Sequence, residues 1–253
     1  MNIPVHRIIP FSNVEGIGNR TSIFVQGCNI NCLYCHNSET IPKKYTDGQM
    51  YTIDRLMDII KDSGPFIRGI TVSGGEPTLY HQGLTELFTQ VHGLGLTCYI
   101  DTNGFFDRHQ LAELIDVTDK FLFDVKAVGE SLKPLCFSDF QLENKVDVGY
   151  ENRFTQGDEH LENLAYLLSL GKIEEVRHVC TKGFNEASDI IRKIIDLIKP
   201  YPEVTLKLIR VHLRGLPKER LLELKGSVPS AQDMEDLGHY AREQGVSKVE
   251  TIL

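Results

Sequence analysis

The stretch Gly27-Cys28-Asn29-Ile30-Asn31-Cys32-Leu33-Tyr34-Cys35-His36-Asn37 decides how the rest of the chain is interpreted. It holds three of the six cysteines, in the spacing C-x3-C-x2-C. Thiolates this close in sequence converge on one metal centre when the backbone between them loops around it, and a glycine before the first cysteine suits such a close approach. Three thiolates fill three corners of a 4Fe-4S cluster, which normally takes four cysteines. The spacing therefore predicts a cluster with one open iron.

Two other metal sites fit the same residues. Cys32 to His36 also reads C-x-x-C-H, the attachment signature of a c-type haem. A zinc site is the second alternative, although His36 is too close in sequence to Cys35 to be a persuasive fourth ligand. The spacing favours the cluster, and it leaves haem and zinc open until the rest of the chain is considered.

The bulk composition is that of an ordinary globular protein, with 253 residues, 41% hydrophobic and 25% charged. The net charge of −8 argues against nucleic acid or an anionic membrane as a partner, because both need basic patches. No apolar run approaches the ~18 residues of a membrane span, and residues 1–7 lack the apolar core of a signal peptide. The other cysteines, Cys98, Cys136 and Cys180, are scattered singly, as expected for buried thiols in a reducing compartment. We therefore expect a cytoplasmic protein that binds neither nucleic acid nor membrane.

Strand-like apolar runs alternate with helical patterns, which predicts βα units and a parallel sheet. The expected strands cover residues 22–26, 69–73, 96–101, 120–125, 175–180 and 205–209, with a closing strand at 248–252. The first expected helix begins at a Thr52 cap. The later helices are expected at about 84–91, 110–115, 159–170, 190–198 and 231–244. Six βα units without a second composition regime predict one domain, 1–253, with an α/β fold of the partial (β/α)6 barrel type.

Polar or glycine-rich residues follow each expected strand, where parallel α/β folds gather their chemistry. They are the cysteine loop, Ser73-Gly74-Gly75-Glu76-Pro77, Asp101-Thr102-Asn103-Gly104 and Asp124-Val125-Lys126, with Arg177 on the fifth strand and His212 after the sixth. Taken singly, the turns after the second, third and fourth strands are explained by ordinary turn and capping roles, and a lone Arg or His is more often a surface or satisfied core residue than a ligand. Together they predict one rim that gathers an open cluster, carboxylates, cations and two glycine turns.

The order of these motifs resembles that of radical S-adenosylmethionine (SAM) enzymes, specifically the activating enzymes of glycyl radical enzymes of the pyruvate formate-lyase activating type. The shared motifs are the cysteine loop with its CLYCHN segment, SGGEP at 73–77, DTNG at 101–104 and D-x-K at 124–126. The segment 14–20, VEGIGNR, is similar to the family's VDGPGxR stretch. The resemblance spans nearly the whole chain and is strongest with the YjjW group.

The resemblance implies one 4Fe-4S cluster held by Cys28, Cys32 and Cys35, with SAM on the open iron. It implies SAM contacts from Tyr34, Cys35, His36, Gly74, Gly75, Glu76, Asp124, Val125, Lys126, Arg177 and His212. It also implies that Asp101, Thr102 and Asp124 help bind a monovalent cation.

The implied reaction is reductive cleavage of SAM to methionine and a 5′-deoxyadenosyl radical, which removes a hydrogen from a glycine Cα of a partner glycyl radical enzyme. A flavodoxin or a ferredoxin-like protein is the implied electron donor. The alternative within the same resemblance is radical SAM chemistry on a small molecule or on another peptide.

The chain departs from the family pattern at three places. Glu15 and Ile17 replace the family's Asp and Pro. The cysteine-rich, ferredoxin-like insert of the YjjW group is absent, so a single cluster is expected. Residues 133–149 resemble an insertion after the fourth strand, and we expect them to help dock or gate the partner's glycine loop. These departures leave the subgroup, and with it the partner enzyme, open.

Overall fold

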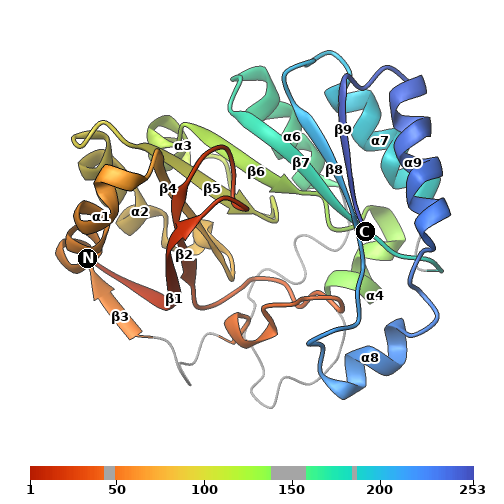
Figure 1. Ribbon diagram of the computed structural model, residues 1–253, viewed down its shortest axis with the longest axis horizontal. Helices are drawn as coiled ribbons and strands as arrows, with labels where there is room; N and C mark the ends of the chain where they lie inside the picture. Colours follow the sequence, from red (N-terminus) through yellow and green to blue (C-terminus); the bar gives the residue numbers. More distant parts are fainter. Residues whose placement is uncertain (43–48, 138–157, 184–186) are drawn as a thin grey trace. The chain divides into compact units, whose positions relative to one another are not determined.

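The computed structural model describes residues 1–42, 49–137, 158–183 and 187–253 (Figure 1). The chain forms two compact units. Among the described residues, unit 1 contains 1–29 and 39–122, and unit 2 contains 30–38 and 123–253. Strand β6, Lys120–Asp124, carries the boundary between them.

Unit 1 is built on a mixed sheet with the strand order β3-β1-β2-β4-β5. Its strands are β1 Asn2–Ser12, β2 Arg20–Val25, β3 Gln49–Thr52, β4 Gly69–Gly74 and β5 Thr97–Thr102. Strands β2, β4 and β5 run parallel, as the sequence pattern predicts. Strand β1 pairs antiparallel with both β2 and β3. The sequence pattern did not predict β1 or β3. Two prolines in β1 obscure it, because proline is unusual inside a sheet.

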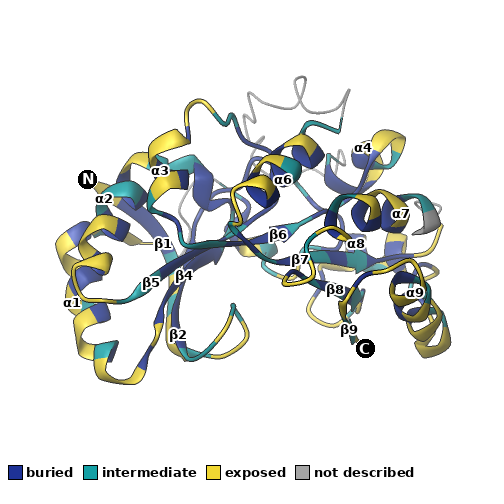
Figure 2. Cartoon of the chain, turned by 90° about the horizontal axis from the view of Figure 1, so that it is seen from above, coloured by how far each residue is buried: buried dark blue, intermediate teal, exposed yellow. Residues whose placement is uncertain are grey.

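The helices of unit 1 follow from helical spacing of apolar residues. They are α1 Ile53–Ser63, α2 His81–His92 and α3 Ala112–Val117. Helix α1 begins where the hydroxyl of Thr52 accepts a 3.2 Å hydrogen bond from the N–H of Arg55. Its buried residues are Ile53, Leu56, Met57, Ile60 and Ser63. In Figure 2, strands β2 and β4 are coloured as buried, and helices α1 and α2 have exposed outer sides.

A buried arginine ties the strands of unit 1 together. Arg20 begins β2 and is 1% exposed. Its Nε donates to the hydroxyl of Thr71 at 2.8 Å, and its Nη2 donates to the carbonyl of Thr97 at 3.1 Å. The guanidinium also lies 3.6 Å from the ring centroid of Tyr99. A buried guanidinium is tolerated where its donors are satisfied, so the last residue of the VEGIGNR segment braces β2 against β4 and β5.

Unit 2 holds a parallel sheet with the order β7-β8-β9. Its strands are β7 Ile173–Cys180, β8 Thr205–Arg210 and β9 Lys248–Ile252. Helices α6, α7 and α9 lie beside this sheet (Figure 1). The described helices are α4 Leu132–Cys136, α6 Glu159–Ser169, α7 Ala187–Ile198, α8 Lys218–Leu224 and α9 Ala231–Glu243. Helix α9 begins with a capping box, in which Ser230 and Asp233 each bond the other's backbone N–H.

The expected α/β fold with an open, largely parallel sheet is confirmed. Among the described residues, no helix combines the length and the apolarity that crossing a lipid bilayer requires. The expectation of a single domain over 1–253 stays a prediction. Of the expected insertion, residues 133–137 belong to α4 and its C-cap, and residues 138–149 lie outside the described ranges.

Candidate active site

The cysteine loop begins where β2 ends. Gly27 has a φ of +100°, a conformation that glycine adopts without steric cost. Its N–H donates to the carbonyl of Thr40 at 2.7 Å, and the N–H of Cys28 donates to the carbonyl of Ile41 at 3.0 Å. Cys28, the first predicted cluster ligand, is 7% exposed. Backbone hydrogen bonds therefore fix the entry to the loop independently of any bound group.

The SGGEP turn packs its backbone on this entry. The N–H of Gly75 donates to the carbonyl of Val25 at 2.9 Å, and the N–H of Glu76 donates to the carbonyl of Gly27 at 2.8 Å. A Cβ added to Gly75 would lie 2.0 Å from the carbonyl oxygen of Gly27. Gly74 has a φ of +107°. Gly75 is thus required by the contact with Gly27, and Gly74 by its positive φ and its close approach to the backbone of Val25 in β2.

Glu76 joins the SGGEP turn to the DTNG turn. Its side chain is fully buried. One carboxylate oxygen accepts from the hydroxyls of Thr78, at 2.7 Å, and Thr102, at 2.8 Å. The other accepts from the N–H of Asn103 at 2.9 Å. Burial raises the pKa of the Glu76 carboxyl, and these hydrogen bonds oppose the rise. The carboxylate therefore acts as an internal brace between the two turns.

Two amides that sequence reasoning missed lie next to Cys28. The Nδ2 of Asn103 donates to the Oδ1 of Asn29 at 2.8 Å and lies 3.8 Å from the Sγ of Cys28. The Nδ2 of Asn29 donates to the carbonyl of Phe105 at 2.7 Å. Asn29 lies in the cysteine loop and Asn103 in the DTNG motif, so their positions were visible in the sequence. Their pairing was not, because it joins segments that are 74 residues apart.

Residues 30–38 of the cysteine loop fold against α4 within unit 2. The N–H of Asn31 donates to the carbonyl of Cys136 at 2.7 Å, and the N–H of Leu33 donates to the carbonyl of Leu135 at 2.8 Å. An isolated parallel bridge joins Asn31 to Phe137. The beginning of the expected insertion is therefore part of the support of the loop.

Arg220 supports the same loop from α8. It is 4% exposed. Its guanidinium donates to the carbonyl oxygen of Cys32 and, at 2.5 Å, to the Oδ1 of Asn31. Sequence reasoning missed this residue, because a single arginine outside any motif carries no signal of a contact 188 residues away.

The cysteines of the loop are free thiols, with Cys28 and Cys32 buried and Cys35 partly exposed. Hydrogen bonding to Cys136 and burial raise the pKa of Cys32. Burial raises the pKa of Cys35 to about 11, whereas Lys126 and Arg220 oppose the rise. A bound metal displaces such protons, because thiolates are the ligand form. Soft sulfur donors fit an iron–sulfur centre or zinc and do not suit a hard cation.

Aromatic residues of the loop reach the strand ends of unit 2. The hydroxyl of Tyr34, a buried residue, donates to the carbonyl of Lys126 at 3.1 Å. The Nε2 of His36 lies 2.9 Å from the carbonyl oxygen of His212, and the two imidazole rings have centroids 3.8 Å apart. Burial lowers the pKa of His36, which favours its neutral form. The structure thus pairs Tyr34 with the backbone of Lys126, and His36 with His212. All four are predicted site residues.

The D-x-K motif, at the end of β6, lies beside Arg177 in the interior of β7. Lys126 Nζ lies 2.5 Å from the Oδ2 of Asp124. The N–H of Val125 donates to the carbonyl of Arg177 at 2.9 Å. The guanidinium of Arg177 donates to one carboxylate oxygen of Glu175 at 2.6 and 2.8 Å. Glu175 is nearly buried, and sequence reasoning missed its part in orienting Arg177.

The residues predicted for a cation are partly engaged by neighbours. The hydroxyl of Ser73 donates to the Oδ2 of Asp101 at 2.9 Å. The hydroxyl of Thr102 donates to Glu76, and Asp124 pairs with Lys126. Asp101 and Thr102 belong to unit 1 and Asp124 to unit 2.

One other group of described residues has the donor types of a metal site. The ligand atoms of His92, Cys98 and Asp119 lie within 4.8 Å of one another. The Nε2 of His92 already lies 2.9 Å from the Oδ2 of Asp119, and the same oxygen accepts from the N–H of Cys98 at 2.7 Å. Burial raises the pKa of the Cys98 thiol. Mutual hydrogen bonding accounts for this group as a structural link within unit 1.

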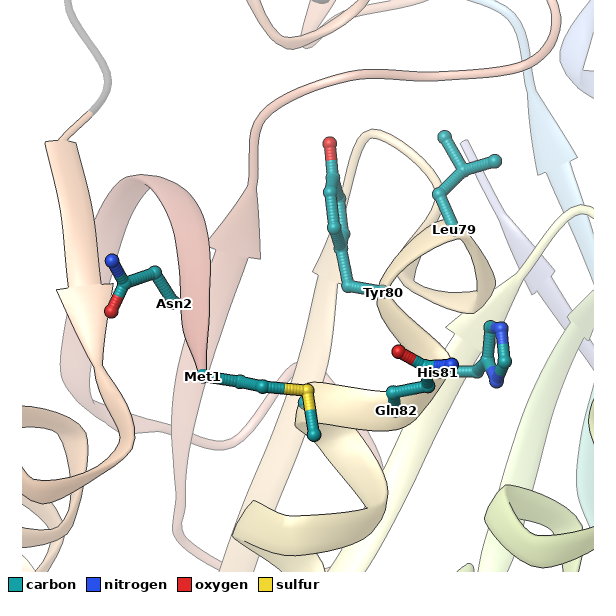
Figure 3. Close-up of a pocket in the computed structure, with 7 residues that line it drawn as sticks. Met1, Asn2, Leu79, Tyr80, His81 and Gln82 are labelled. Atoms are coloured by element: carbon teal, nitrogen blue, oxygen red, sulfur yellow. The ribbon is translucent and has the colours of Figure 1, made fainter.

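A cavity of about 200 Å³ opens in unit 1 near the N-terminus (Figure 3). It is lined by Met1, Asn2, Leu79, Tyr80, His81, Gln82 and Gly83. The hydroxyl of Tyr80 donates to the carbonyl of Gln26, just before the cysteine loop. None of the predicted site residues lines this cavity.

Comparison with known proteins adds three findings. Residues 22–186 match the family description of the radical SAM superfamily. A protein of Haemophilus influenzae, provisionally named a glycyl-radical enzyme activating enzyme, is 47% identical over 99% of this chain and 97% of its own length. The pyruvate formate-lyase-activating enzyme of Streptococcus mutans is 29% identical over 88% of this chain and 84% of its own length.

Among solved structures, QueE from Escherichia coli superposes with a TM-score of 0.57 over 99% of this chain and 94% of its own. Its sequence identity is 14%, so this likeness concerns the fold alone.

Proposed function

The chain belongs to the radical SAM superfamily, and from this premise we propose that it removes a hydrogen atom from a glycine of a partner glycyl radical enzyme. The family resemblance drawn from the sequence is confirmed, and so is the class of enzyme, a radical SAM activase. The observation that carries the proposal is the three-cysteine loop. It occurs in a chain that is 47% identical, over 99% of its length, to a provisionally named activating enzyme.

The superfamily implies a 4Fe-4S cluster and SAM, which decides against the haem and zinc alternatives. We assign the cluster to Cys28, Cys32 and Cys35. The motif supplies three cysteines and no fourth, and this number fits a cluster with one open iron. Lys126 and Arg220 add positive charge near Cys35 and so favour its thiolate form.

When bound, the cluster supplies the electron that splits SAM into methionine and a 5′-deoxyadenosyl radical. The protein's own residues bind, orient and exclude water. Gly74, Gly75 and Glu76 would present the turn that receives the amino end of SAM. The tight packing of that turn on Gly27 supports this role, because it holds the backbone rigid beside Cys28.

We assign the remaining SAM contacts to residues of unit 2. They are Tyr34, Cys35, His36, Asp124, Val125, Lys126, Arg177 and His212. The contacts of His36 with His212 and of Tyr34 with Lys126 support this assignment, since each joins two of these residues. The Asp124–Lys126 pair offers both signs of charge to the amino and carboxylate groups of SAM.

Three finer points belong to the same proposal. Asp101, Thr102 and Asp124 supply oxygen ligands, the type that a hard monovalent cation prefers. The electron donor would be a flavodoxin or a ferredoxin-like protein, since the reaction needs one-electron reduction. The cytoplasm fits as the location, because none of the six cysteines forms a disulfide.

The experiment that tests this function is anaerobic cluster reconstitution followed by a SAM cleavage assay. The wild-type protein should bind four irons per chain and release 5′-deoxyadenosine when a reductant is added. Replacing Cys28, Cys32 or Cys35 by Ala should abolish both results. Cys98→Ala and Cys180→Ala serve as matched controls and should retain them. Equal loss of iron in a control and in a cluster variant would contradict the assignment.

A further inference from the structure

The side-chain amide of Asn103 is aimed at the sulfur of Cys28. Its Nδ2 donates to the Oδ1 of Asn29 at 2.8 Å and to the Sγ of Cys28 at 3.8 Å. An amide nitrogen carries two hydrogens, so both hydrogen bonds form at once. All three residues are buried, which keeps water from competing for the same sulfur.

The backbone of Phe105 fixes which way both amides point. The N–H of Phe105 donates to the Oδ1 of Asn103 at 3.0 Å, and its carbonyl accepts from the Nδ2 of Asn29 at 2.7 Å. Turning either amide over would bring two donors or two acceptors together. The N–H of Asn103 in turn donates to the carboxylate of Glu76 at 2.9 Å. The amide nitrogen of Asn103 therefore faces Cys28 before any group is bound.

We propose that Asn103 is a positioning residue that donates a hydrogen bond to the sulfur of Cys28 when Cys28 holds the cluster, and thereby raises the reduction potential of that cluster. The inference rests on the proposed function. It adds a role for a residue that the sequence assigns neither to the cluster, nor to SAM, nor to the cation.

The direction of this hydrogen bond follows from the chemistry of the ligand. In the metal-free chain the thiol of Cys28 also donates, to the Oδ1 of Asn29 at 3.9 Å. A cysteine bound to iron has lost its proton and can only accept. Of the contacts between Cys28 and the two asparagine side chains, the donation from Asn103 is then the one that remains.

Such a hydrogen bond changes how readily the cluster accepts an electron. Reduction adds negative charge to the cluster and to its sulfur ligands, and a donor aimed at a ligand sulfur stabilises that charge. The potential therefore rises, and the reduced state becomes easier for the electron donor to reach.

Asn19 provides the matched control. Its Nδ2 donates to a backbone carbonyl of the same unit, that of Phe66, at 2.8 Å. It precedes β2, whereas Cys28 follows the other end of that strand. Loss of the Asn19 amide therefore removes a side-chain donor from unit 1 without touching the sulfur.

The test compares three variants of the reconstituted full chain. Asn103→Ser leaves a hydroxyl that can accept from the N–H of Phe105, as serine does in turns, but has no amide to reach Cys28. Asn103→Asp keeps the acceptor for Phe105 and replaces the amide nitrogen by an oxygen. Asn19→Ser is the control. The measurements are iron per chain and the midpoint potential of the cluster, followed by EPR in an anaerobic redox titration.

We expect a shift to more negative potential in Asn103→Ser, a shift at least as large in Asn103→Asp, and none in Asn19→Ser. A potential in Asn103→Ser equal to that of the wild type would overturn the inference, and so would an equal shift in Asn19→Ser. If one Asn103 variant assembles no cluster, the potential of the other decides. Failure of both, with a loaded Asn19→Ser, would mean that Asn103 only supports the fold and would overturn the inference. A wild-type protein without any cluster would refute the proposed function itself, and the inference with it.

Discussion

The backbone N–H of Glu76 donates a 2.8 Å hydrogen bond to the carbonyl oxygen of Gly27. This bond joins the residue before the first predicted cluster ligand to the turn that is assigned to SAM. The carboxylate of Glu76 extends the connection to Thr102 and Asn103. Three motifs that are far apart in the sequence are thus one hydrogen-bonded structure in unit 1.

Gly75→Ala should disrupt this structure. The new Cβ would lie 2.0 Å from the carbonyl oxygen of Gly27, and the backbone on both sides must shift to admit it. We expect a loss of about 2–3 kcal/mol of stability, as for overpacking of an interior, together with weaker SAM binding. Thermal unfolding and SAM titration measure the two effects. Gly64→Ala is the control, since its Cβ meets nothing within 4 Å, and a Gly75→Ala protein that matches it would refute the close contact.

Arg220→Lys should loosen the cysteine loop. Lysine cannot reproduce the two-pronged donation to the carbonyl of Cys32 and the side chain of Asn31. We expect lower iron occupancy after reconstitution and a loss of roughly 1–3 kcal/mol of stability, because a buried acceptor loses its donor. Iron analysis and thermal unfolding check both. Arg192→Lys, on the exposed side of α7, should change neither. Full iron loading in Arg220→Lys would show that the loop holds without this contact.

Asp124→Asn and Lys126→Ala should each weaken SAM binding. The two side chains form an ion pair at the end of β6, and each is about one-fifth exposed. Loss of a hydrogen bond to a charged group costs about 1.5 kcal/mol, which corresponds to roughly tenfold in affinity. Equilibrium titration of the reconstituted protein with SAM measures the change, with Asp196→Asn on α7 as a surface control. An unchanged affinity in the double variant would count against the assignment of both residues.

His160 should make the fold sensitive to acid. Burial lowers its pKa from the ordinary 6.5 to about 4, with Asp158 opposing the shift. Between these values the unfolded chain takes up a proton that the folded chain does not, so stability falls as the pH drops from 6.5 toward 4. The loss from this residue should be roughly 3 kcal/mol.

Urea unfolding at several pH values checks this prediction. His160→Gln should flatten the dependence between pH 6.5 and 4, whereas His239→Gln, an exposed change on α9, should not. The same slope in His160→Gln and wild type would show that other groups control acid unfolding.

The sequence pattern predicted the parallel strands because their apolar runs are continuous and the cysteine, SGGEP, DTNG and D-x-K motifs follow them directly. It missed β1, which contains two prolines, and the short strand β3, which pairs antiparallel with β1 from a distant part of the sequence. It also missed Arg220 and Glu175. Each acts on a motif residue through a contact in space, and side-chain contacts of this kind leave no spacing to recognise.

The expected insertion shows the same limit. Its first residues, 133–137, carry backbone contacts to the cysteine loop, so a test of its role in docking the partner must begin after Phe137. The proposal that the later residues contact the glycine loop of the partner stays a prediction.

The proposed function requires this chain to generate a glycyl radical on a partner enzyme. The most direct measurement is EPR spectroscopy after anaerobic mixing of the reconstituted protein, SAM, a reductant and candidate glycyl radical enzymes. We predict a glycyl-radical signal with one candidate, lost when Cys35→Ala replaces the wild type and when the partner's glycine is changed to alanine. SAM cleavage without a radical signal on any candidate, accompanied by modification of a small molecule or another peptide, would contradict it.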